Sequence, residues 1–99
     1  MTATVVQYRA KVDRADENQQ LIDAVFRSLE ESAPEGFTYR VFRLEDGVSF
    51  VHVAIEHDEV PDPDSLQDDP AFQAFVAGIG ERCEVAPVAR GATVVGEYR

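Results

Sequence analysis

The sequence has few basic residues and no long apolar run. Nine lysines and arginines stand against 19 aspartates and glutamates, which gives a formal net charge of −10 at pH 7. A phosphate backbone or an anionic membrane surface attracts the opposite balance of charge. No apolar segment approaches the roughly 20 residues that cross a bilayer, and residues 1–12 lack a basic region followed by an apolar block. We therefore predict no nucleic-acid partner, no membrane partner and a cytoplasmic location.

Cysteine and the side-chain clusters that hold metals or phosphates are equally scarce. The single cysteine, Cys83, excludes an internal disulfide, and its place on an apolar stripe favours a small core residue over a nucleophile. The sequence contains no glycine-rich phosphate loop, zinc-type set or Ser/His/Asp motif. The acidic segment 58–69 lacks the spacing and central glycine of a calcium loop. We expect no metal and no cofactor.

The residues that are present suit one small domain spanning 1–99. Of the 99 residues, 44% are hydrophobic and 28% are charged, which is ordinary globular usage. Alternating side chains predict a first strand over 5–12, with Val6, Tyr8, Ala10 and Val12 on one face. A helix should follow and end before Pro34, because its apolar residues recur at helical spacing: Leu21, Ile22, Val25 and Leu29, with Phe26 beside them.

A β-hairpin is predicted next, because Phe37–Glu45 and Val48–His57 are rich in β-branched and aromatic residues and flank Asp46-Gly47. A two-residue turn would place three cross-strand pairs on one face: Arg43 with Phe50, Val41 with His52, and Tyr39 with Ala54. The opposite face would carry Phe42, Leu44, Val51, Val53 and Ile55. Since this second face is the more uniformly apolar, we expect it to meet the helices.

The second half of the chain predicts a surface connection, a helix and a strand. Residues 58–69 are rich in proline and acids, as in a surface loop. Asp69 followed by Pro70 is typical of a helix start. The stripe of this second helix comprises Phe72, Phe75, Val76, Ile79 and Cys83, and Pro87 should stop it. A fourth strand is expected from Arg90 to Tyr98.

This order of elements predicts an α+β, ferredoxin-like βαββαβ fold with a four-stranded antiparallel sheet and two helices on one face. Right-handed crossovers place strand 1 beside strand 3 and strand 4 beside strand 1. The other sheet face would then be bare, and by the assignment above it carries Tyr39, Val41, Phe50 and Ala54. That is too much apolar surface to leave in water, so we expect a homodimer that buries this face.

Three passages carry a family resemblance: the first strand with its acidic helix start, Pro34-Glu35-Gly36-Phe37, and Leu66 to Phe75 at the second helix. With them the chain resembles the antibiotic-biosynthesis-monooxygenase-like (ABM) proteins of the dimeric α+β barrel superfamily. The resemblance covers nearly the whole chain by element order. It implies oxidation of aromatic or quinol-type compounds by dioxygen, often without metal or flavin, in a pocket between the sheet and the helices.

The candidate catalytic residues lie on one predicted face of the hairpin. His52, Tyr39, Arg43 and Glu56 could orient a phenol or an acid and exchange a proton with it. The alternative is a polar network between the two sheets of the dimer, and we favour that network. The walls of a pocket would come from Phe72, Phe75, Val76 and Ile79.

Two functions follow. The first is a cofactor-independent monooxygenase acting on a small aromatic or quinol-type molecule. The second is a non-catalytic homodimeric module that binds a small ligand or another protein. Members of the family that oxidise substrates commonly carry a tryptophan after the third strand and a histidine near the second helix. This chain has no tryptophan, and its segment 58–69 has no histidine.

Overall fold

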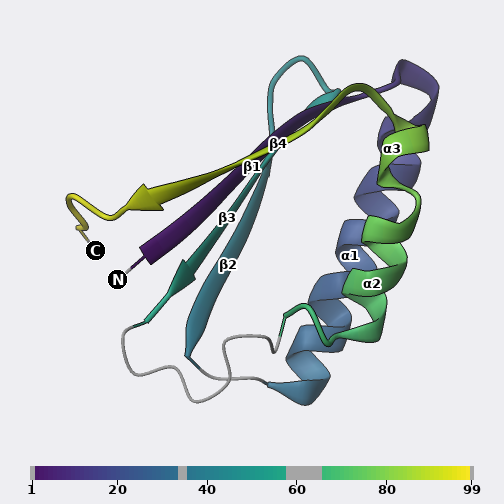
Figure 1. Cartoon of the computed structure of the whole chain (residues 1–99). Coiled ribbons are helices and arrows are strands. Elements are labelled where there is room, and N and C mark those ends of the chain that lie inside the picture. The colour runs from purple at the N-terminus through teal and green to yellow at the C-terminus, as the bar shows by residue number, and fades with distance from the viewer. Residues whose placement is uncertain (1, 34–35, 58–65, 99) are drawn as a thin grey trace.

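The computed structural model describes residues 2–33, 36–57 and 66–98. The elements in chain order are β1 (Thr2–Ala10), the 3₁₀ helix η1 (Val12–Arg14), α1 (Ala15–Ser32), β2 (Phe37–Arg43), β3 (Ser49–Glu56), α2 (Pro70–Ala77), α3 (Ile79–Arg82) and β4 (Cys83–Thr93). The strands form one antiparallel sheet in the order β2-β3-β1-β4, and the helices cover one face of it (Figure 1). The predicted fold and strand order are confirmed. Within the described ranges, no helix is both long and apolar enough to span a membrane.

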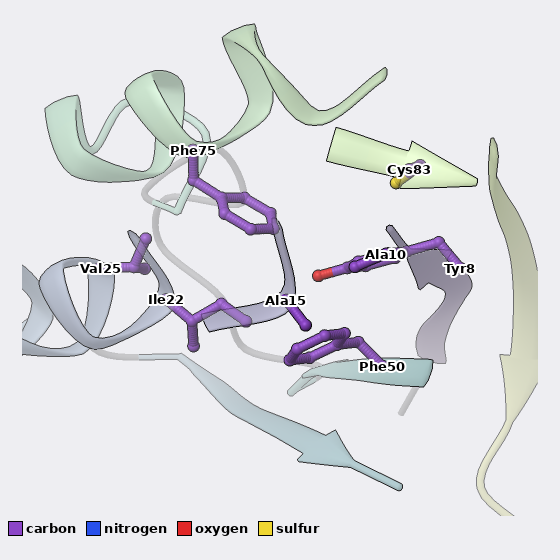
Figure 2. Packing of buried hydrophobic residues seen from close by; sticks show 8 residues of the cluster. All are labelled: Tyr8, Ala10, Ala15, Ile22, Val25, Phe50, Phe75 and Cys83. Atoms are coloured by element: carbon purple, nitrogen blue, oxygen red, sulfur yellow. The ribbon is translucent and has the colours of Figure 1, made fainter. Parts of the chain in front are cut away.

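The core lies between the helix-facing side of the sheet and the three helices. Ile22 and Val25 on the apolar stripe of α1 are buried, as their spacing predicts. From the sheet, Tyr8 and Phe50 point towards them with stacked rings whose centroids lie 5.5 Å apart (Figure 2). Phe75 of α2 closes the cluster from the other side. Val12 is not on this face, because the strand ends at Ala10 and Val12 is 83% exposed in η1.

The face assignment of the hairpin was wrong, although its register was right. Arg43 pairs with Phe50, Val41 with His52 and Tyr39 with Ala54, as predicted. These side chains face the helices, however, and Phe50 is only 1% exposed. The reason is the pairing of β1 with β3, which sets Tyr8 directly beside Phe50 and so gives both residues the same face. The bare face is the opposite one, which carries Phe42, Leu44, Val51, Val53 and Ile55.

The hairpin turn is longer than the two residues expected. The ladder ends where the Leu44 N–H donates to the Ser49 carbonyl at 2.8 Å, and inside it the Gly47 N–H donates to the Leu44 carbonyl at 3.0 Å. Gly47 has a φ of +79°, whereas Asp46 is not left-handed. Asp46 instead accepts hydrogen bonds from the backbone of Val48 and Ser49 through its carboxylate. The loop is therefore residues 45–48, with one left-handed position at its glycine.

The second helix is shorter than predicted and the last strand begins earlier. The helical stripe is interrupted at Gly78, and Cys83 is a buried strand residue paired with Ala10 rather than the end of that stripe. Pro87 does not stop a helix but lies inside β4, at a register irregularity opposite β1. β4 is an edge strand, where a missing N–H is tolerated. Residues 94–98 are outside the strand, contrary to expectation.

The start of α2 confirms the predicted cap. The Asp69 carboxylate accepts from the backbone N–H groups of Ala71 and Phe72, and Pro70 occupies the first turn. Asp69 also accepts from the Ser28 hydroxyl at 2.7 Å, which ties α2 to α1. Most of the acidic connection lies outside the described residues, namely Asp58, Glu59, Asp62 and Asp64.

Candidate functional site

A cavity of about 320 Å³ lies between the helix-facing side of the sheet and α2. Its walls are mainly apolar, and its polar groups come from the sheet. The cavity is lined by Thr4, Val6, Tyr8, Phe37, Tyr39, His52, Ala54, Glu56, Leu66, Gln67, Phe72, Phe75, Val76, Ile79 and Pro87. A pocket of this size and character is typical of a site for one small organic molecule.

The helical wall consists of the residues that the stripe places there. Phe72, Phe75, Val76 and Ile79 all line the cavity. Phe72 and Phe75 lie 6.3 Å apart by ring centroid, and Phe75 is 5.3 Å from the imidazole of His52. Phe75 is buried, whereas Val76 is 46% exposed and stands where the wall meets solvent. The wall therefore offers aromatic surfaces against which a planar ligand can pack.

His52 is held between two phenols at the floor of the cavity. Its Nε2 lies 2.7 Å from the Tyr8 hydroxyl, and its Nδ1 lies 2.7 Å from the Tyr39 hydroxyl. Burial lowers the pKa of His52 from 6.5 to about 4, because the charged imidazolium loses its water. The imidazole is therefore neutral near pH 7. Since both nitrogens are hydrogen-bonded, His52 has no free lone pair for a ligand.

Tyr39 is the more exposed of the two tyrosines that flank His52, so its hydroxyl is the one most open to a ligand. Its ring stacks on Phe26 at 5.3 Å and meets Phe72 edge-on at 6.3 Å, so the hydroxyl is held in one place by α1 and α2. Tyr39 is half-buried and lines the cavity. Burial raises the pKa of both Tyr8 and Tyr39 well above the usual phenol value. Both hydroxyls therefore stay protonated and can donate hydrogen bonds.

The hydrogen bonds of Tyr8 continue away from the cavity to Asn18 and Arg82, two residues that the sequence analysis did not single out. The Asn18 amide nitrogen donates to the Tyr8 hydroxyl at 2.8 Å, and the Arg82 Nε donates to the Asn18 oxygen at 3.1 Å. Asn18 and Arg82 are 0% and 3% exposed. The sequence could have indicated that Asn18 is buried, because it lies four residues before Ile22 on the buried stripe of α1. A buried polar side chain needs a partner, and here it has two.

Arg82 is fixed by contacts that also explain the break in the second helix. Its second guanidinium nitrogen donates to the Phe75 carbonyl at 2.6 Å, and its guanidinium carbon lies 5.1 Å from the centroid of the Phe75 ring. A Cβ at Gly78 would approach this guanidinium to 2.9 Å. The glycine therefore leaves room for a buried positive charge. No carboxylate of the described residues forms an ion pair with it.

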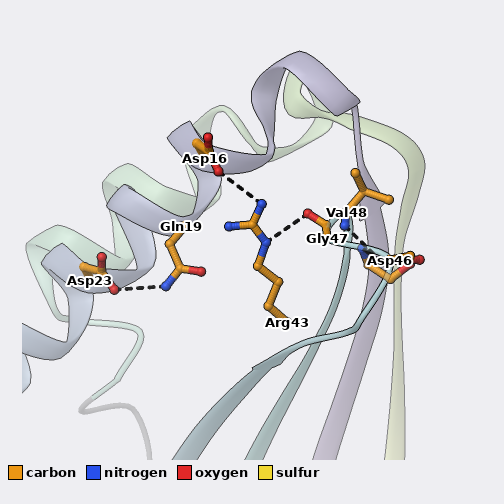
Figure 3. A network of polar contacts seen from close by, with 8 residues as sticks. Asp16, Gln19, Asp23, Arg43, Asp46, Gly47 and Val48 are labelled. Atoms are coloured by element: carbon orange, nitrogen blue, oxygen red, sulfur yellow. Dashed lines mark hydrogen bonds and ion pairs between the residues drawn. The ribbon is translucent and has the colours of Figure 1, made fainter.

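Arg43 and Glu56, the other two predicted catalytic residues, do not join His52. Arg43 lies at the hairpin end of the sheet, where it donates to the Gly47 carbonyl at 2.9 Å and to Asp16 at 3.1 Å (Figure 3). It does not line the cavity. Glu56 does line the cavity, but it lies four residues from His52 at the far end of β3. The structure thus brings His52 and Tyr39 together, leaves Glu56 at a distance and separates Arg43.

The favoured alternative for His52, a network between dimerised sheets, was wrong in its location. His52 is 5% exposed beneath the helices and is not on the bare face. Its partners are Tyr8 and Tyr39 instead of Arg43 or Glu56. Across residues 2–33, 36–57 and 66–98, no three histidine, cysteine or acidic side chains converge as a metal site would require.

Solved structures share this architecture, although no family model and no curated protein matches the sequence. Rv0793 of Mycobacterium tuberculosis is 17% identical, with a TM-score of 0.76 over 99% of this chain and 98% of that one. A crystal structure of an antibiotic biosynthesis monooxygenase is 20% identical, with a TM-score of 0.70 over 97% of this chain and 100% of that one. The fold is that of the antibiotic biosynthesis monooxygenases. SnoaB, a cofactor-independent oxygenase from Streptomyces nogalater, also has it, at 13% identity and a TM-score of 0.70 over 97% and 94%.

Within this fold, the site combines an aromatic wall with the hydroxyl donor of Tyr39. The wall can hold a planar ring. The Tyr39 hydroxyl can bond an oxygen on that ring, and His52 and Tyr8 support it from behind. The neutral imidazole cannot take a proton from the ligand directly. Proton exchange with His52 would therefore pass through a phenol, and Tyr39 is the more exposed of the two.

Proposed function

We propose that this chain is an ABM-like monooxygenase that oxidises a small aromatic or quinol-type molecule in the cavity, without a cofactor. One observation carries the proposal: a cavity of about 320 Å³ with aromatic walls has a phenol–imidazole pair at its floor. SnoaB, which shares the fold, is a cofactor-independent oxygenase. The role of Tyr39 and His52 in catalysis is part of this proposal.

The residues act by binding and orienting the ring. Phe72 and Phe75 hold its faces, and the Tyr39 hydroxyl bonds one of its oxygens. Glu56 is the one carboxylate among the described lining residues and is assigned as the group that takes the proton of the substrate hydroxyl. Ionisation makes the ring electron-rich, which is what a reaction with dioxygen requires in the absence of a metal or flavin. The apolar walls keep water from the reacting carbon.

The reaction balances with dioxygen as the only oxidant. The ionised quinol gives an electron to dioxygen, and the two fragments join to form a carbon–oxygen bond. The O–O bond then breaks, so one oxygen atom stays on the ring and the other leaves as water. A dihydroxyaromatic and O₂ thus give a hydroxyquinone and H₂O. The ring loses four electrons. The departing oxygen becomes water by taking the proton that Glu56 accepted and the hydrogen that leaves the attacked ring carbon as a proton.

Labelled dioxygen tests this reaction. We expect 1,4-dihydroxynaphthalene under ¹⁸O₂ to give 2-hydroxy-1,4-naphthoquinone that carries one labelled atom, faster with protein than without it. Tyr39→Phe should lower the rate by about tenfold to a hundredfold, because it removes the hydroxyl that orients the ring. The matched control is Tyr98→Phe, at an exposed tyrosine outside the sheet. Unlabelled quinone at the protein-free rate would overturn the proposal.

The second candidate is a non-catalytic homodimeric module that binds a small ligand, and one observation favours it. Both nitrogens of His52 are taken by phenols, so the cavity has no imidazole base. The same experiment separates the two functions. Binding of the dihydroxynaphthalene without ¹⁸O in any product would favour the binding module.

A further inference from the structure

The hydrogen bonds behind the cavity run in one direction, and Arg82 sets that direction. A guanidinium has donors only, so the Arg82 Nε–H must donate to the side-chain oxygen of Asn18, at 3.1 Å. The other end of the Asn18 amide therefore faces Tyr8. Its nitrogen donates to the Tyr8 phenolic oxygen at 2.8 Å. The orientation of this amide is thus fixed by a neighbour that cannot accept.

The same reasoning fixes the proton of Tyr8 and the tautomer of His52. The Tyr8 oxygen already accepts from Asn18, and the other partner of its hydroxyl is the Nε2 of His52 at 2.7 Å. Tyr8 is 4% exposed and its hydroxyl has no further partner among the described residues, so a proton turned towards the apolar cavity would lose its acceptor. Tyr8 therefore donates to Nε2. The proton of the neutral imidazole must then sit on Nδ1.

Tyr39 is the cavity end of this hydrogen-bond chain, because Tyr8 and His52 also line the cavity but are only 4% and 5% exposed. The His52 Nδ1–H donates to the Tyr39 oxygen at 2.7 Å, so the proton of Tyr39 points away from the imidazole. Tyr39 lines the cavity. We infer that the Tyr39 hydroxyl donates to a negatively charged ligand oxygen, that of a phenolate or enolate, and that Asn18 and Arg82 are positioning residues that set this polarity. The inference rests on the proposed function, because it specifies the charge state of the ligand.

The charge at the far end of this hydrogen-bond chain and the direction of its donors favour an anionic ligand oxygen. Arg82 is a buried positive charge at the far end, and every donor between it and the cavity points towards the cavity. Hydrogen bonds aligned in this way strengthen one another in a low-dielectric interior. Burial keeps Tyr8, Tyr39 and the nearby thiol of Cys83 protonated by raising the pKa of each. Among the described lining residues, the opposing charge is Glu56, at the other end of β3.

The tautomer of His52 is measurable in the parent protein. The chain has two histidines, His52 and His57. Nitrogen-15 NMR distinguishes a protonated ring nitrogen from a bare one, and His57→Gln assigns the signals. We expect His52 to carry its proton on Nδ1 at neutral pH. A proton on Nε2 would overturn the inference, because Tyr39 would then donate to His52 and offer the ligand only lone pairs.

Asn18→Asp should reverse the direction of the hydrogen bonds from residue 18 to Tyr39. A carboxylate keeps the contact with Arg82 but has no proton to donate to Tyr8. Tyr8 would therefore donate to the new aspartate and accept from the Nε2–H of His52. Tyr39 would then donate to the bare Nδ1. The tautomer should therefore switch. Gln20→Glu is the matched control, because it adds the same charge at an exposed position of the same helix. Its His52 tautomer should be that of the parent.

A coloured phenol reports the polarity at the ligand. With 4-nitrophenol at a pH equal to its own pKa, the absorption spectrum gives the bound ratio of phenolate to phenol. We expect the parent and Gln20→Glu to favour the phenolate, and Asn18→Asp to lower the ratio by about tenfold or more, the effect of one hydrogen bond to a charged group. Equal ratios in all three proteins would overturn the inference and leave the proposed function standing. If the parent binds no phenol, the proposed function fails, and the NMR tautomer alone decides the polarity.

Discussion

The imidazole of His52 lies between two phenols, and its burial determines the pH range in which it affects stability. Its pKa is about 4 in the folded protein and 6.5 without burial. Between these values the unfolded chain binds a proton that the folded chain does not. The contribution of His52 to stability therefore falls as the pH drops from 6.5 towards 4, by up to about 3 kcal/mol, and is constant above that range.

His52→Gln should remove this pH dependence, because glutamine does not titrate. Urea unfolding at several pH values between 4 and 6.5 measures it. His57→Gln, at an exposed position, is the control and should keep the slope of the parent. Asp46 acts in a different range, since hydrogen bonds from Ser49 and Val48 lower its pKa from 3.8 to about 2. A slope that survives in His52→Gln would mean that the imidazole is not the buried group.

At the scale of elements, the sheet presents a bare apolar face to its surroundings. Phe42 and Leu44 of β2 are 48% and 44% exposed, and Val85 and Val88 of β4 are 52% and 50% exposed. The centre of the face is aliphatic, and arginines from three strands lie on the same side near its ends and edges: Arg9, Arg40 and Arg90. An apolar centre with a polar rim is typical of a protein interface. We expect a second copy to cover it, face to face about a two-fold axis.

Val51→Glu tests this dimer, because Val51 lies on the bare side of the central strand β3. The change should give monomer in sedimentation at micromolar concentration, since the interface would bury an unpaired charge. Gln73→Glu, on the exposed side of α2, should leave the dimer intact. Phe50→Glu would not test the dimer, because Phe50 lies in the core of the subunit and not on the bare face. A parent protein that sediments as a monomer of 11.0 kDa would contradict the prediction.

The strands also show which parts of the fold could be read from local sequence. The order of elements, the hairpin register and the Asp69 cap follow from alternation, turn residues and capping chemistry. The orientation of β3 does not, because both of its faces are apolar and only its pairing with β1 decides which one meets the helices. The boundary between α3 and β4 was missed because an edge position accommodates Pro87.

At the scale of the whole molecule, the cavity was predictable from the sequence. The chain of hydrogen bonds behind it, from Arg82 to Tyr39, was not. The helical stripe contains Phe72 and Phe75. In a βαββαβ fold this stripe faces the sheet, so its side chains line either the core or a pocket. The contact of Arg82 with Asn18 joins residues 64 apart in sequence, through side chains of α3 and α1. No local pattern encodes such a contact. It emerges only when both helices have packed on the sheet.

The central claim is that the cavity between the sheet and α2 binds a small aromatic molecule, and calorimetric titration without oxygen tests it most directly. The parent protein and Ala74→Phe, at an exposed site on α2, should bind 1,4-dihydroxynaphthalene equally. Ala54→Phe should abolish binding, because Ala54 lines the cavity beside Tyr39 and a phenyl ring there would fill it. Unchanged binding by a folded Ala54→Phe protein would contradict the account, since the ligand would then lie elsewhere.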